Sequence, residues 1–108
     1  MKWCRDIYVG DSVAGKKRKI LHNLKHGRLQ INVYVITLPL SEAGIMEIYP
    51  SYVFLQKIYK KQDIYVIGLA SDRWEAYELA EKIVMDCYKA TGAFNIKQYI
   101  YGRQVSRL

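Results

Sequence analysis

The sequence predicts a single α+β domain in which two βαβ halves share one sheet. The chain has 108 residues, a length that suits one hydrophobic core. Two segments echo each other, because residues 6–10 read Asp-Ile-Tyr-Val-Gly and residues 63–68 read Asp-Ile-Tyr-Val-Ile-Gly. Each is followed by a helical pattern, a glycine and another strand pattern. This repetition indicates two related halves.

The first half reads as strand, helix and strand. Residues 6–10 combine β-branched and aromatic side chains and end at a turn glycine. Over about 12–26 the apolar residues recur at helical spacing, and Gly27 follows as a stop signal. Residues 29–38 alternate apolar with polar side chains and are rich in β-branched types. They therefore predict a strand that ends before Pro39.

The second half repeats this order. Residues 63–69 predict a strand. Asp72, with a glutamate three residues later, resembles a capping box at the start of the longest helix, which is expected over 72–91 and is followed by a stop glycine. A last strand is expected over about 94–101, because apolar and aromatic residues alternate there with polar ones.

The link between the halves is longer than a hairpin needs, since about 24 residues separate the strands that flank it. Within it, residues 41–50 are expected to form a short helical turn that ends before Pro50, and residues 51–61 a short amphipathic helix. Two arrangements of the sheet therefore remain open.

The first arrangement is a ferredoxin-like split βαβ sheet, with the first strands of the two halves side by side at its centre and the helices on one face. The alternative is a mainly parallel three-layer α/β/α sandwich, in which the 51–61 helix covers the second face. In both, residues 1–102 form the domain and residues 103–108 a basic C-terminal tail.

Positive charge is concentrated near the start of the chain. The formal net charge is +7, and residues 1–28 hold eight cations against two anions. Four of these cations are consecutive, namely Lys16, Lys17, Arg18 and Lys19. Such asymmetry is typical of a surface that faces a polyanion, although the solvated surface of a small domain reaches a similar net charge.

Alternation along the predicted strands puts the tyrosines on one face of the sheet and leaves an aliphatic face to pack the helices. The expected tyrosine face comprises Tyr8, Tyr34, Tyr65, Tyr99 and Tyr101. An open sheet face of this kind, close to cations, is how RRM-like domains stack the bases of single-stranded RNA. The cations from Lys16 to Lys19 would then hold the phosphates. The alternatives are a second subunit on this face or cover by the chain's own 51–61 helix.

A second candidate contact surface lies on the longest predicted helix, where large apolar side chains flank Glu81 on a stripe that faces away from the expected core. These residues are Trp74, Tyr77, Met85 and Tyr88. Trp and Tyr are favoured anchors at contact surfaces, so the stripe is a candidate interface between two copies of the chain. Ile36 and Ile67, which share the tyrosine face and do not stack on bases, are further candidate interface residues.

Catalytic motifs are weak. Residues 10–16 match the G-x4-G-K spacing of a phosphate loop, but Lys17 stands where a magnesium-binding hydroxyl is needed. His22 and His26 are four residues apart on a helical face whose cations would repel a metal ion. No nucleophile motif stands out. The sequence favours a non-enzymatic protein with no catalytic residues, no metal and no cofactor.

The sequence also predicts a cytoplasmic location. The opening residues lack the apolar segment of a secretory signal, and no apolar run reaches the length of a membrane helix. Three stretches, INVYVI (31–36), DIYVIGLA (63–70) and ELAEKIV (78–84), resemble a group of short, uncharacterised cytoplasmic proteins of Gram-positive anaerobic bacteria. The resemblance implies a cytoplasmic bacterial protein and carries no activity.

The expected function is therefore that of a small binding or accessory protein that self-associates as a homodimer. The alternative is a protein that binds single-stranded RNA, or another polyanion, through the tyrosine face and the basic N-terminal helix.

Overall fold

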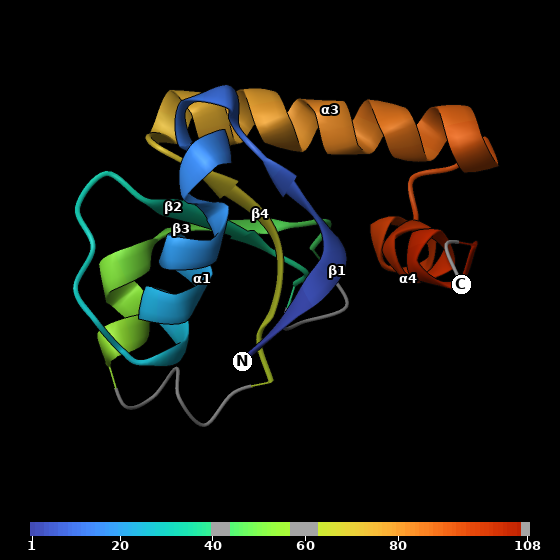
Figure 1. Cartoon of the computed structure of the whole chain (residues 1–108). Helices are drawn as coiled ribbons and strands as arrows, with labels where there is room; N and C mark the ends of the chain where they lie inside the picture. The colour runs from blue at the N-terminus through green and yellow to red at the C-terminus, as the bar shows by residue number, and fades with distance from the viewer. Residues whose placement is uncertain (40–43, 57–62, 107–108) are drawn as a thin grey trace.

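The computed structural model shows an α+β fold built on one four-stranded sheet (Figure 1). It describes residues 1–39, 44–56 and 63–106. The strands are β1 (Lys2–Val9), β2 (Tyr34–Thr37), β3 (Glu47–Pro50) and β4 (Tyr65–Ala70). The helices are α1 (Lys17–Lys25), α3 (Arg73–Thr91) and α4 (Ile96–Ser106), with the short 3-10 helices η1 (Asp11–Lys16) and η2 (Ser51–Leu55).

The strand order is β1-β4-β2-β3. β1 runs parallel to β4, whereas β2 is antiparallel to both β4 and β3. The β1–β4 pair confirms that the first strands of the two halves lie side by side. β1 is nevertheless at an edge of the sheet and not at its centre, because the segment predicted as the last strand is helical.

That segment, 94–101, contributes most of α4 instead. Its isoleucines and tyrosines suit a strand, but Ile96 and Ile100 are one helical turn apart and both are buried. The Oδ1 atom of Asn95 accepts a hydrogen bond of 3.1 Å from the backbone N–H of Gln98, as a helix N-cap does. Burial of one helical face and this cap outweigh the strand propensity.

Other predicted elements are shorter than expected. The strand predicted over 29–38 is reduced to β2, and the helix predicted over 12–26 begins as η1 and continues as α1. β3 forms inside 41–50, which was expected to be helical, and its Pro50 is tolerated because β3 is an edge strand. The helix predicted over 51–61 is represented by η2, and residues 57–62 lie outside the described part of the chain.

The longest helix, α3, has the boundaries that its sequence predicts. Asp72 is its N-cap, and the Asp72 carboxylate accepts a hydrogen bond of 2.8 Å from the backbone N–H of Glu75. Gly92 follows the helix with φ +72°, in the left-handed region that favours glycine. The Gly92 N–H donates to the carbonyl oxygen of Tyr88 at 2.8 Å.

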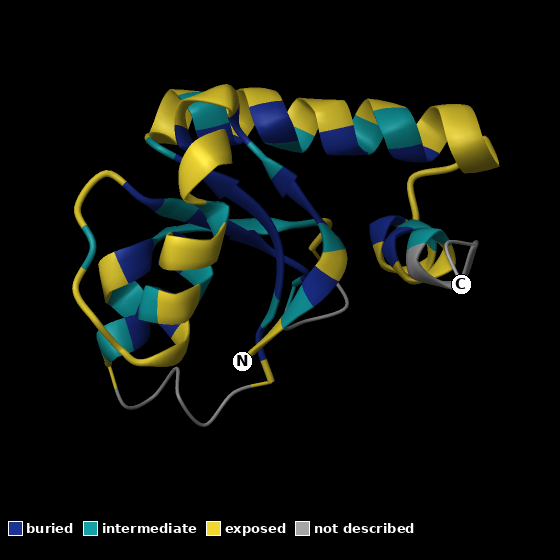
Figure 2. Ribbon diagram, viewed as in Figure 1, coloured by how far each residue is buried: buried dark blue, intermediate teal, exposed yellow. Residues whose placement is uncertain are grey.

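Helices cover both faces of the sheet (Figures 1 and 2). α3 and α4 pack on the face that bears Ile36 and Ile67, and α1, η1 and η2 pack on the face that bears Val35 and Val66. The prediction that all helices occupy one face is therefore wrong. The covering of both faces agrees with the three-layer alternative, but the sheet is mixed, since one of its three strand pairs is parallel.

β4 contains a bulge opposite β2. Ile36 pairs with Gly68 and Thr37 with Val66, so that Ile67 is an extra residue on this strand. A Cβ atom at Gly68 would lie 3.2 Å from the Cβ atom of Ile36. Glycine therefore allows Ile36 to pack closely over β4.

A polar network attaches α4 to β1 and α3. Arg103 of α4 forms a salt bridge with Asp6 of β1. Its guanidinium carbon lies 4.3 Å from the ring centre of Tyr8 and 5.6 Å from that of Tyr99. The Tyr8 hydroxyl donates to the Asp86 carboxylate of α3 at 2.8 Å and lies 3.0 Å from the Tyr99 hydroxyl. The five residues come from three elements, of which β1 is far in the sequence from α3 and α4.

Burial raises the pKa of Tyr8 above its usual value, and the hydrogen bonds with Tyr99 and Asp86 raise it further. The phenol therefore remains protonated and donates to Asp86 throughout the physiological pH range.

Because Arg103 lies within α4, the predicted boundary between a domain of 1–102 and a tail of 103–108 falls inside a helix.

Replacing Arg103 with alanine is expected to lower the free energy of unfolding by about 2 kcal/mol, because the change removes the ion pair with Asp6 and the contacts with two aromatic rings. Gln98→Ala is the control, since Gln98 is exposed on the same helix. It is expected to change the free energy by less than about 0.5 kcal/mol. Urea denaturation followed by circular dichroism measures both variants, and equal losses would contradict the role assigned to Arg103.

Candidate functional site

The five predicted tyrosines lie on one face of the sheet or on the helix that covers it, and they do not form an open platform. Tyr8, Tyr34 and Tyr65 lie on one face of the sheet, as the alternation predicts. Tyr99 and Tyr101 belong to α4, which packs against that same face. Tyr8 is buried, three of the others are half-buried, and Tyr101 is exposed. The face is thus covered by α3 and α4, whereas η2, which begins the 51–61 segment, packs on the opposite face.

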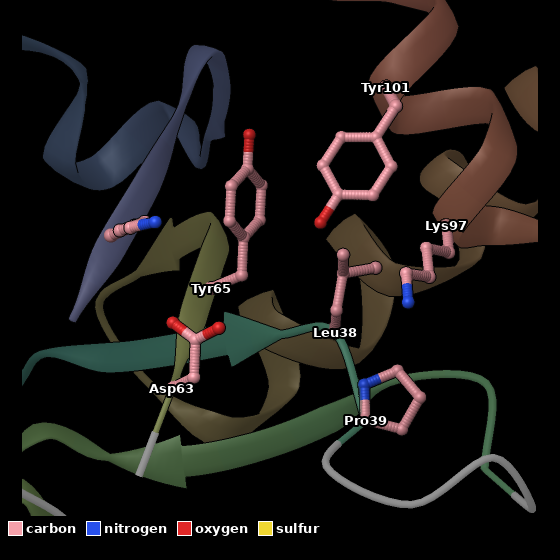
Figure 3. Close-up of a pocket in the computed structure, with 7 residues that line it drawn as sticks. Leu38, Pro39, Asp63, Tyr65, Lys97 and Tyr101 are labelled. Atoms are coloured by element: carbon pink, nitrogen blue, oxygen red, sulfur yellow. The ribbon is translucent and has the colours of Figure 1, made fainter. Parts of the chain in front are cut away.

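A hollow of about 670 Å³ remains at the edge of this face, between the sheet and α4 (Figure 3). Its walls come from β1, β4, α4 and the chain just after β2 and before β4. The lining residues are Lys2, Leu38, Pro39, Asp63, Tyr65, Lys97 and Tyr101. The Tyr65 and Tyr101 rings meet edge to face, with their centres 5.5 Å apart and an angle of 67° between their planes. Two of the predicted tyrosines therefore line a cavity.

The predicted cations lie on the other side of the sheet. Lys16 ends η1, and the three that follow open α1, whose Ile20 and Leu24 pack on the face opposite the tyrosines. Lys16, Arg18 and Lys19 are exposed, and Lys17 is half-buried. The structure does not bring these cations and the tyrosines onto one surface.

Four consecutive cations are unfavourable at the start of α1. The amino end of a helix carries partial positive charge and favours anions. The first turn of α1 contains no acidic residue, and the sequence has none between residues 12 and 28. The positive charge gathered there raises the electrostatic free energy of the fold, and a bound polyanion would lower it.

The stripe on α3 is exposed, and Figure 2 shows exposed residues along the outer side of this helix. The exposed fractions are 73% for Trp74, 48% for Tyr77, 46% for Met85 and 49% for Tyr88. The ring of Phe94 stacks on that of Tyr88, with the centres 5.1 Å apart, and extends the apolar surface beyond the end of the helix. Sequence reasoning missed Phe94 because it placed this residue in a strand.

Ile36 and Ile67, the other predicted interface residues, are fully buried beneath α3. They belong to the core because α3 covers the face from which they project. The assignment of Ile36 and Ile67 to an interface is therefore wrong.

The turn that resembles a phosphate loop is occupied by a carboxylate of the chain. The side chain of Glu75 accepts hydrogen bonds from the backbone N–H groups of Ser12, at 3.2 Å, and Ser71, at 2.8 Å. A Cβ atom at Gly10 would lie 2.4 Å from the Glu75 Oε1 atom, so glycine is needed for this approach. A phosphate at the turn would meet a negative charge, and Glu75 instead ties the end of β1 to the start of α3.

The cysteines and histidines do not assemble into a further centre in the described part of the chain. Cys4 and Cys87 are buried free thiols, and burial raises the pKa of Cys4. The rings of His22 and His26 stack with their centres 4.2 Å apart. Within 1–39, 44–56 and 63–106, no three His, Cys, Asp or Glu side chains gather as metal ligands. No helix in these ranges has the length and apolar character needed to span a bilayer.

The stability of the fold is expected to fall in mild acid in a way that depends on Glu75. Burial alone would raise the pKa of this carboxyl, but the hydrogen bonds from Ser71 and Ser12 outweigh burial and lower the pKa below its ordinary value. The stabilisation is therefore complete above the ordinary carboxyl pKa of about 4.3 and is lost as the pH falls through the lower folded-state value.

Glu75→Gln should lower the free energy of unfolding by about 1 kcal/mol at neutral pH and by progressively less toward pH ~3. Glu78→Gln, an exposed change on the same helix, is the control and should leave the acid dependence as it is. Urea titrations at several pH values measure this difference. Parallel pH curves for wild type and Glu75→Gln would show that the carboxylate is not engaged at this turn.

The chain matches no protein-family model, no curated protein and no solved structure, so its surfaces and cavities alone indicate its function.

Proposed function

We propose that this protein is a non-enzymatic accessory protein that acts by self-association through the exposed stripe of α3. The observation that carries the proposal is the concentration of large apolar side chains on one helix, opposite its buried face. Trp74 is 73% exposed, and its ring meets that of Tyr77 edge to face at 5.9 Å. Exposed Trp and Tyr of this kind are characteristic anchors of protein–protein contacts.

The spacing of the stripe supports a second copy of the chain as the partner. Trp74 and Tyr88 are each seven residues from Glu81, and Tyr77 and Met85 are each four. A twofold axis at Glu81 would pair two antiparallel α3 helices so that Trp74 meets the partner's Tyr88 and Tyr77 meets the partner's Met85. An isologous interface needs this kind of self-complementary patch, and sulfur–aromatic contacts are favourable.

The two Glu81 carboxylates would face each other at the centre of this pair, and like charges there oppose association. Glu81 therefore distinguishes the antiparallel pair from a general hydrophobic contact. Removal of the Glu81 charge is therefore expected to strengthen the dimer if the two copies meet at Glu81, and not if they meet elsewhere.

Sedimentation velocity from micromolar to millimolar concentration tests this dimer. Trp74→Glu should weaken the dimer at least about tenfold, and Glu81→Gln should strengthen it. Tyr52→Glu is the control, because Tyr52 is exposed on η2, away from α3. A monomer at every concentration would overturn the proposal, and a Trp74→Glu dimer as tight as wild type would exclude the stripe as the contact.

A second function, the binding of a polyanion such as single-stranded RNA, is favoured by the charge at the start of α1. Cations at the amino end of a helix destabilise it. A polyphosphate partner would lower the electrostatic free energy of a surface that carries four consecutive cations. We propose that the polyanion contacts Lys16, Arg18 and Lys19, with Lys17 beside them. The covered tyrosines are not part of this contact.

The double variant Arg18→Glu/Lys19→Glu should reduce the affinity for single-stranded RNA while raising the free energy of unfolding by about 0.5–1 kcal/mol. The affinity and the free energy of unfolding should thus change in opposite directions. A variant with a disrupted fold would instead show a lower affinity and a lower free energy of unfolding. Lys82→Glu/Lys89→Glu, two exposed changes on α3 that alter the net charge equally, is the control for net charge. Fluorescence anisotropy across a range of salt concentrations measures binding. No binding of wild type at low salt would rule this function out.

A further inference from the structure

The hollow between the sheet and α4 has the size and lining of a small-molecule site. Its volume of about 670 Å³ falls within the range of roughly 300–1,000 Å³ that is usual for such sites. Apolar, aromatic and charged side chains converge on it from different elements. This site is independent of the α3 stripe and of the cations of α1.

One part of the lining suits a flat ring. Tyr65 rises from β4 and Tyr101 descends from α4, and Figure 3 shows the two rings side by side above Leu38, where they meet edge to face. Leu38 and Pro39 provide an apolar base. Tyr101 is 42% exposed, so its ring remains accessible at the mouth. Aromatic side chains arranged in this way hold planar heterocycles by stacking and edge contacts.

Another part of the lining suits an anion with hydrogen-bond donors. Lys2 comes from β1 and Lys97 from α4, so two ammonium groups and the carboxylate of Asp63 border the hollow among the residues that the structure describes. Lys97 and Tyr101 are one turn apart on α4 and act on the same side of the cavity (Figure 3). Ammonium groups bind phosphate as point charges, and a carboxylate accepts hydrogen bonds from hydroxyl or amino groups.

We infer that this hollow binds a nucleoside monophosphate, whose base packs against the Tyr65–Tyr101 pair on the ring of Tyr101 that is accessible at the mouth, and whose phosphate is held by Lys97 and Lys2. A planar base, an anionic phosphate and sugar hydroxyl donors match the aromatic, cationic and acidic parts of the lining in one molecule. The nucleotide is either free or the end of a single strand, since both present the same chemistry to the hollow.

Isothermal titration calorimetry of the full chain with AMP tests the site, with adenosine and inorganic phosphate as the two halves of the ligand. AMP should bind at least about tenfold more tightly than either half, because both parts of the lining are then engaged. Tyr101→Leu should weaken AMP binding at least about fivefold, and Lys97→Gln should weaken AMP binding more than adenosine binding.

Lys89→Gln, which changes an exposed lysine outside the hollow, is the matched control. A short oligoadenylate distinguishes the two sources: binding tighter than that of AMP and weakened by Tyr101→Leu indicates a strand end in the hollow, and equal or weaker binding indicates a free nucleotide. No heat with AMP at millimolar concentration, or AMP binding that neither variant alters, would overturn the inference. The Trp74→Glu variant should bind AMP as wild type does, so failure of self-association and failure of this site are separable.

Discussion

The attachment of α4 to the sheet through Arg103 determines which surfaces this protein presents. The guanidinium group joins Asp6 of β1 to the rings of Tyr8 and Tyr99, and the Tyr8 hydroxyl extends the network to Asp86 of α3. With α4 in this position, the tyrosine face of the sheet becomes an interior layer. The same placement leaves the hollow at its edge, because α4 crosses the face without filling the space beside β4.

Local signals predicted the parts of the fold that depend on local interactions. The Asp72 cap, the stop at Gly92 and the apolar face of α3 are all present in the structure as the sequence indicates. The repeated strand motif predicted the pairing of β1 with β4, and the alternation placed Tyr8, Tyr34 and Tyr65 on one face. These features need only neighbours within one element or one pair of strands.

Features that depend on tertiary packing could not be read in the same way. The segment that begins α4 has β-forming residues, and its helical state is decided by the burial of Ile96 and Ile100 against the sheet. The exposure of the tyrosines depends on whether this segment is a strand or a helix. As a strand it would leave the tyrosine face open, but as a helix it covers that face. The α3 stripe was predicted because it follows from helix periodicity, whereas Glu75 at the phosphate-like turn joins residues 63 positions apart.

The parallel pairing of β1 with β4 has a consequence for the folding of the chain as it is made. An antiparallel hairpin closes within a few residues, but β1 lacks a partner until residue 70 has left the ribosome, and its ion pair with Arg103 forms later still. The nascent β1 segment, followed by a run of cations, must therefore remain unpaired while the residues up to the end of β4 are translated. Repulsion between the positive charges would keep this unpaired strand from associating with other copies on the same polysome.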